Sequence, residues 1–106
     1  MDTFKIDDMK GGWFVGDFEP SMHKTQSCEV AYKEYKAGFI DQQHHHKIAT
    51  EFTLITKGHV KMNDLELKAG DGVVIKPGES IEFTVLEDAS TVVVKIPGAS
   101  NDKYID

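Results

Sequence analysis

Three consecutive histidines followed by a glutamate are the residues of this sequence best suited to chemistry. Side chains alternate between the two faces of a β-strand, so His44 and His46 would share one face and His45 the other. Glu51 comes five residues after His46, at the start of another predicted strand. Two imidazoles and one carboxylate on neighbouring strands suit a divalent transition metal such as Zn, Fe, Ni, Mn or Cu. We therefore predict His44, His46 and Glu51 as metal ligands.

Short β-rich runs surround these residues, and Gly, Pro and Asn-Asp punctuate them. This pattern is typical of an all-β sandwich or barrel, and no long stretch has a helical period. The predicted strands cover residues 12–18, 27–35, 39–47, 50–56, 59–62, 65–67, 72–75, 80–86 and 90–96. The predicted ligands therefore lie on two strands that follow each other in the chain.

Turn residues define the ends of these strands. Asn63-Asp64 predicts a two-residue hairpin, because both residue types tolerate a positive φ. Lys57-Gly58 is predicted to end the strand at 50–56, and residues 87–89 are predicted to turn the chain before the last strand. In the strand at 27–35 the two alternating faces are similar in polarity, so the sequence does not indicate which of them points into the core.

Length and charge limit the domain organisation and the classes of partner. The 106 residues fit one domain, with N-terminal strands and a loop at 1–27, a barrel core at 28–97 and a polar tail at 98–106. The net charge of −6 argues against binding to nucleic acid or to an anionic membrane. We see no signal peptide and no apolar run that could span a bilayer, so we expect a cytoplasmic protein.

The spacing around the histidines resembles the first motif of the cupins. That motif is a glycine, five residues, His-x-His, three or four residues, a glutamate, six residues and a second glycine. Gly38, His44, His46, Glu51 and Gly58 fill it without a spacing error. The resemblance covers about residues 28–97 and implies a jelly-roll barrel, or double-stranded β-helix, with the metal inside its open mouth.

The second cupin motif is present only in part. It opens at 70–71 and closes at 76–78, but the histidine that supplies the fourth ligand in the family falls on Ile81. Strand alternation turns the neighbouring Glu82 outward. We therefore expect a site with three protein ligands or a site of reduced affinity. Glu79, or Glu82 if a bulge turns it inward, would be the alternative fourth ligand.

The resemblance leaves the chemistry open, because cupins include dioxygenases, isomerases, decarboxylases and non-catalytic binding proteins. One hypothesis is a metal-dependent isomerase or dioxygenase that acts on a small molecule such as a carbohydrate derivative. The alternative is a non-catalytic cupin that binds a small ligand or serves as a homodimeric interaction module. Whether the protein is an enzyme is not decided by the sequence.

We also expect a homodimer. Small cupins pair through N-terminal strands, and the segment at 12–18 carries Trp13 and Phe14 at a predicted sheet edge.

A second compositional feature concerns ligands: all 12 basic residues are lysines. The chain therefore has no guanidinium group to hold an anion in a bidentate way.

Overall fold

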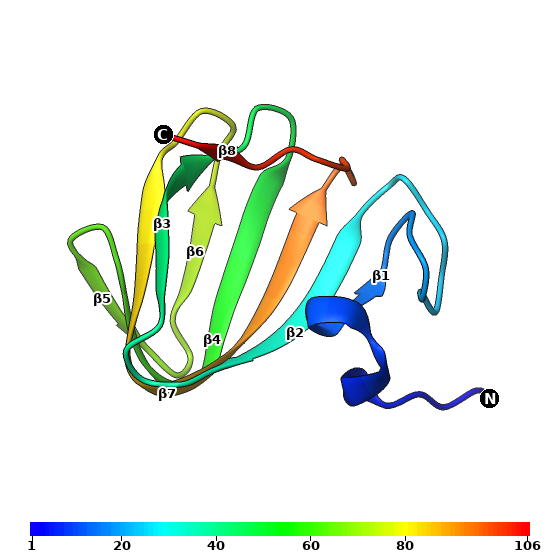
Figure 1. The fold of residues 1–106 in the computed structure, drawn as a ribbon, viewed down its shortest axis with the longest axis horizontal. Coiled ribbons are helices and arrows are strands. Elements are labelled where there is room, and N and C mark those ends of the chain that lie inside the picture. Colours follow the sequence, from blue (N-terminus) through cyan, green and yellow to red (C-terminus); the bar gives the residue numbers. More distant parts are fainter.

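The computed structural model describes residues 1–106 and consists of β-strands with two short 3₁₀-helices near the N-terminus (Figure 1). The elements are η1 (Ile6–Asp8), η2 (Lys10–Gly12), β1 (Trp13–Val15), β2 (Glu29–Tyr35), β3 (Ile40–His45), β4 (Thr50–Met62), β5 (Leu65–Lys68), β6 (Gly72–Ile75), β7 (Ile81–Ile96) and β8 (Tyr104–Ile105). All of the strand pairs are antiparallel. The all-β prediction is therefore confirmed. No helix is long and apolar enough to cross a membrane.

Two long strands, β4 and β7, pair with each other along most of their length. Each of them covers two of the predicted strands; the break predicted at 57–58 and the turn predicted at 87–89 are both wrong. These two segments face each other in the structure, and the register of the pair shifts there. β-Bulges bend a strand without ending it, so the polar residues that resemble turns mark a bend in two paired strands.

Two residues with positive φ shape the ends of the barrel. Gly58 has a φ of +86°, and an added Cβ would lie 2.2 Å from the carbonyl oxygen of Asp88, so only glycine fits this bend. Asn63 has a φ of 51° in the hairpin between β4 and β5, as predicted. Its side chain also donates to the Ser80 carbonyl and accepts from the Glu82 N–H, which ties the hairpin to β7.

The interior of the barrel is apolar at one end and polar at the other. Along β4, the inward side chains change from Glu51 and Thr53 to the fully buried Ile55 and Val60. Because β7 runs antiparallel to β4, its apolar half lies beside the apolar half of β4. The other halves of β4 and β7 pair with each other and carry polar side chains, and His44 of β3, which pairs with Ile81 at the start of β7, faces them across the same cavity.

The structure settles which face of β2 is internal. Glu29 and Ala31 are buried, whereas Val30 and Tyr32 are only half-buried and face the other side of the sheet. The inner face of this strand is thus the more polar one. It adds charged side chains to the polar end of the barrel.

The last residues of the chain do not form the polar tail predicted at 98–106. They fold back across the polar end of the barrel, where β8 pairs with β3 at His44 and His45 (Figure 1). Asp102 is only 3% exposed. The segment is polar because its polar groups bond to the barrel, and it forms part of the site.

Candidate metal centre

A cavity of about 380 Å³ opens at the polar end of the barrel. The three predicted ligands, His44, His46 and Glu51, all line it. They come from β3, from the residue that follows β3 and from the start of β4. The structure thus brings all three predicted residues to one cavity of a size that suits a small molecule.

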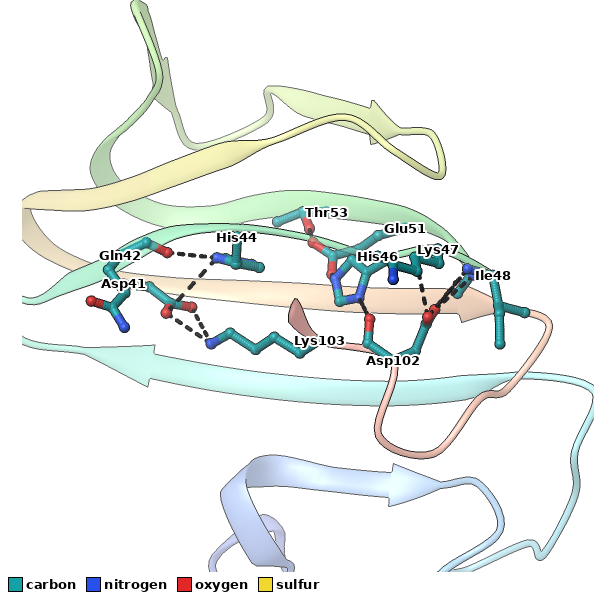
Figure 2. Close-up of polar contacts among 11 residues, drawn as sticks. Asp41, Gln42, His44, His46, Lys47, Ile48, Glu51, Thr53, Asp102 and Lys103 are labelled. Carbon is teal, nitrogen blue, oxygen red and sulfur yellow. Dashed lines mark hydrogen bonds and ion pairs between the residues drawn. The ribbon is translucent and has the colours of Figure 1, made fainter. Parts of the chain in front are cut away.

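Backbone carbonyls determine the tautomers of the two buried histidines (Figure 2). His44 Nδ1 lies 2.8 Å from the Gln42 carbonyl oxygen, and His46 Nδ1 lies 2.8 Å from the Asp102 carbonyl oxygen. A carbonyl can only accept, so Nδ1 carries the proton in both rings. Each neutral imidazole therefore keeps a free lone pair on Nε2, the arrangement typical of metal-binding histidines.

Glu51 lies next to His46 in this cavity. Its Oε2 accepts a hydrogen bond of 2.9 Å from the Thr53 hydroxyl, and its Oε1 lies 3.3 Å from His46 Nε2. The carboxylate raises the pKa of His46. Burial alone would raise the pKa of Glu51, but the contacts with His46 and Thr53 lower it overall. The carboxylate therefore stays ionised inside the barrel.

The contact between His46 and Glu51 favours a positive charge between the two side chains. His46 Nε2 is buried and has no hydrogen-bond partner. When His46 is neutral, the lone pair of this atom faces a carboxylate oxygen, and two acceptors repel each other. A proton or a metal ion between the two atoms removes that repulsion.

His44, His46 and Glu51 fit a divalent metal in donor type, tautomer and charge, but their side chains do not converge on one point. No group of three or more His, Cys, Asp or Glu side chains converges closely enough to form a complete metal site. His46 and Glu51 are in contact, whereas the ring centroid of His44 lies 5.8 Å from that of His46. His44 thus faces the same cavity from a greater distance.

The remaining residues singled out in the sequence lie where strand alternation predicts. His45 points away from the cavity and contacts the Asp106 carboxylate. Ile81 is buried, pairs with His44 across β3 and β7, and lines the cavity. Glu82 is exposed on the outer side of β7. No bulge turns Glu82 inward to replace the missing fourth ligand.

Asp102 is the main site residue that sequence reasoning missed. Besides holding His46 through its carbonyl, its carboxylate accepts hydrogen bonds from the N–H groups of Lys47, Ile48 and Ala49 (Figure 2). These three residues form the loop that joins the histidines to Glu51. Nothing in the pattern around residue 102 indicates this role. Thr53 could have been found, because it lies two residues after Glu51 on the same strand face.

An antiparallel β-barrel that gathers a His-x-His pair and a glutamate at its open end defines the cupin class of proteins. Residues 24–96, more than half of the chain, match the family described as the quercetinase C-terminal cupin domain. This chain therefore belongs to that family, and the cupin resemblance of its sequence is confirmed. No curated protein matches the sequence.

Similar solved structures share the same fold. An uncharacterized conserved protein with a double-stranded beta-helix domain from Klebsiella pneumoniae is 20% identical over 97% of this chain and 89% of its own, with a TM-score of 0.71. The DMSP lyase DddQ from Ruegeria pomeroyi is 17% identical over 88% of this chain and 49% of its own, with a TM-score of 0.73. A cupin sugar phosphate isomerase from Silicibacter pomeroyi is 19% identical over 66% of this chain and 50% of its own, with a TM-score of 0.61. This chain spans about half the length of the last two proteins.

Proposed function

We propose that this protein binds one divalent transition metal through His44, His46 and Glu51 and acts on a small molecule that enters the cavity. The observation that carries the proposal is the buried Nε2 of His46, which lacks a hydrogen-bond partner and lies 3.3 Å from a carboxylate oxygen. When bound, the metal supplies a Lewis acid with open positions for a substrate. Zn, Fe, Ni, Mn and Cu all suit this donor set.

The residues of the chain have separate tasks in this proposal. The carbonyls of Gln42 and Asp102 hold the two imidazoles with Nε2 free, and the Thr53 hydroxyl orients Glu51. Apolar side chains from β4 and β7, including Ile81, wall the cavity and keep water away from the ligands. The arrangement suits metal-dependent isomerisation or oxygenation of a small molecule such as a carbohydrate derivative. Two of the similar structures are enzymes, a lyase and a sugar phosphate isomerase, and this likeness supports a catalytic function.

A second candidate function is non-catalytic binding of a small ligand in the same cavity. Two observations favour it: Ile81 lies where the family's fourth ligand would be, and no three ligand side chains converge. Metal content separates the two functions, because only the first requires a bound ion.

Untagged protein equilibrated with each candidate metal is expected to hold one equivalent at about pH 8 and to lose it as the pH falls toward about 5. Ligand imidazoles must be neutral, and the Glu51 carboxylate raises the pKa of His46. Protons therefore begin to compete with the metal at a higher pH than for an ordinary histidine. Elemental analysis after gel filtration measures the occupancy. A protein that carries no metal at any pH would favour the binding function.

Ile81→His is expected to tighten metal binding about tenfold or more, because it adds an imidazole beside His44 in the cavity. Glu82→Ala is the matched control at the neighbouring position and is expected to leave the affinity unchanged, since Glu82 is exposed. Competition with a metal-chelating dye measures both affinities. Weaker binding in Glu82→Ala, with no gain in Ile81→His, would show that Glu82 is itself a ligand.

We further propose that two copies of the chain form a homodimer through the outer face of the sheet. Phe14 of the predicted N-terminal interface stacks on Phe4 at a centroid distance of 5.3 Å, so it is already partnered. The outer face instead exposes Phe52, Leu54 and Val74, with Phe52 and Val74 paired directly across β4 and β6. An exposed apolar sheet face can pack against its own copy around a two-fold axis.

Phe52→Lys is expected to convert the dimer to a monomer, because it buries a charge at the centre of this face. Leu65→Lys, at a side chain 60% exposed on β5, is the control and is expected to leave the dimer intact. Light scattering at micromolar concentration gives the mass. A wild-type protein that is monomeric in this range would contradict the proposal.

A further inference from the structure

Two lysines share one indole ring at the mouth of the cavity. Lys33 Nζ and Lys95 Nζ each lie 5.0 Å from the centroid of the Trp13 ring. All three residues line the cavity that holds the histidines and Glu51. The lysines come from β2 and β7, and Trp13 comes from β1.

Neither lysine has an acidic partner. Lys33 Nζ donates to the Gly11 carbonyl at 2.8 Å, and Lys95 Nζ contacts the Trp13 ring. Neither ammonium forms an ion pair. An ammonium has three N–H donors, so both groups keep donors that no protein atom satisfies.

The other charged groups in the cavity are already engaged. Lys103 pairs with Asp41 at 2.8 Å, and Glu51 is held by His46 and Thr53. Glu51 is also the cross-strand neighbour of Lys95, yet the two do not approach within ion-pair distance. Neither lysine therefore has a carboxylate in direct contact, and Glu51 and Asp41 act on Lys33 only from a longer distance.

The two ammonium groups are also kept close together at an energetic cost. Burial lowers the pKa of Lys33, and the nearby charge of Lys95 lowers it further. Two like charges side by side repel each other, and an anion bound between them is attracted by both. The cation–π contacts with Trp13 offset part of this repulsion.

We propose that Lys33 and Lys95 form an anion-binding subsite for a carboxylate or phosphate group of the small molecule that occupies the cavity. The indole ring of Trp13 contacts both ammonium groups and offers apolar surface for the adjoining part of that molecule. The ligand would thus be a small organic anion with its charged group at the mouth and its remainder directed toward His44, His46 and Glu51. Because the chain has no arginine, the two lysines replace a bidentate guanidinium.

This proposal deepens the proposed function, since it rests on the cavity being a ligand site, but it does not require a metal. The test therefore uses chelator-treated, full-length protein. Trp13 is the only tryptophan of the chain, so its fluorescence reports binding at this position directly. The probes are benzoate, phenyl phosphate and the uncharged benzamide, titrated at constant ionic strength.

Benzoate or phenyl phosphate is expected to change the fluorescence saturably and to bind at least about tenfold more tightly than benzamide. The tighter of the two anions identifies the charged group as carboxylate or phosphate. This comparison needs no variant, so it holds even where a substitution disturbs folding. Equal affinities for the anions and benzamide would overturn the proposal.

Lys33→Gln and Lys95→Gln are each expected to weaken anion binding about tenfold, and Lys95→Arg is expected to restore most of it. Lys61→Gln is the matched control: it removes the same charge from an exposed position on β4 outside the cavity. An equal loss of anion affinity in Lys61→Gln would mean that the lysines act only through the overall charge of the protein. This result would contradict the subsite. Metal binding is measured separately, so a protein that holds anions but no metal would refute only the metal function.

Discussion

Replacing His46 by alanine is expected to lower metal affinity at least about a hundredfold, whereas His45→Ala is expected to leave it unchanged. His46 is buried, directs its Nε2 at Glu51 and has no other hydrogen-bond partner for that atom. His45 points to the other side of β3 and contacts Asp106. Titration of both variants with Zn²⁺ against a chelating dye gives the comparison.

His44→Ala extends this experiment to the ligand that is less close. His44 lies on the same side as His46 and keeps Nε2 free, so its loss is expected to weaken binding as strongly. Equal losses from His45→Ala and His44→Ala would mean that the metal, if bound, sits outside the cavity. Unfolding midpoints of the metal-free variants show whether any loss arises from misfolding instead.

Asp102→Ala is expected to lower the free energy of unfolding by about 3 kcal/mol, the largest stability loss expected for any single substitution in the last nine residues. The substitution removes the acceptor for three backbone N–H groups, one of which belongs to the fully buried Ala49. Burial alone would raise the pKa of Asp102, but these N–H groups lower it overall. Its contribution is therefore complete above the pKa of an unfolded aspartate and is lost in acid, as the pH falls through the lowered value.

Urea unfolding of the metal-free protein, at neutral and at acidic pH, measures this loss. Asp106→Ala is the matched control, because it removes a carboxylate of the same segment that contacts His45 and accepts from no backbone N–H group. A much smaller loss is expected there. If both substitutions destabilise the protein equally, the folded-back segment contributes only through general packing and not through Asp102.

Local patterns predicted most of the fold and the core of the candidate site. The hairpin at Asn63-Asp64 and the strand at 72–75 follow from residues that act within a few positions of each other. The three predicted ligands share a cavity because alternation places His44 and His46 together and the barrel brings Glu51 beside them. These features depend on periodicity and on turn chemistry, which a single sequence contains.

The errors arise where tertiary pairing overrides local signals. Polar residues at 87–89 resemble a turn, but β7 continues through them because β4 bends beside it. Asp102 looks like one acidic residue in a polar segment, and its role depends on a loop 53 to 56 positions earlier in the chain. Lys33 and Lys95 become neighbours only when β2 pairs with β7. Such long-range placements have no local signature.

The fold-back of the C-terminal segment also sets an order of events during synthesis. His46 obtains its Nδ1 acceptor from a residue 56 positions later, so the ring cannot be oriented until nearly the whole barrel has left the ribosome. Contacts of such long sequence separation form late in folding, because the chain must first lose the entropy of closing the loop. Orientation of the His46 ring is therefore a late step of folding. A nascent chain that ends before residue 102 would lack the carbonyl that orients His46, whereas His44 would keep its own acceptor at Gln42.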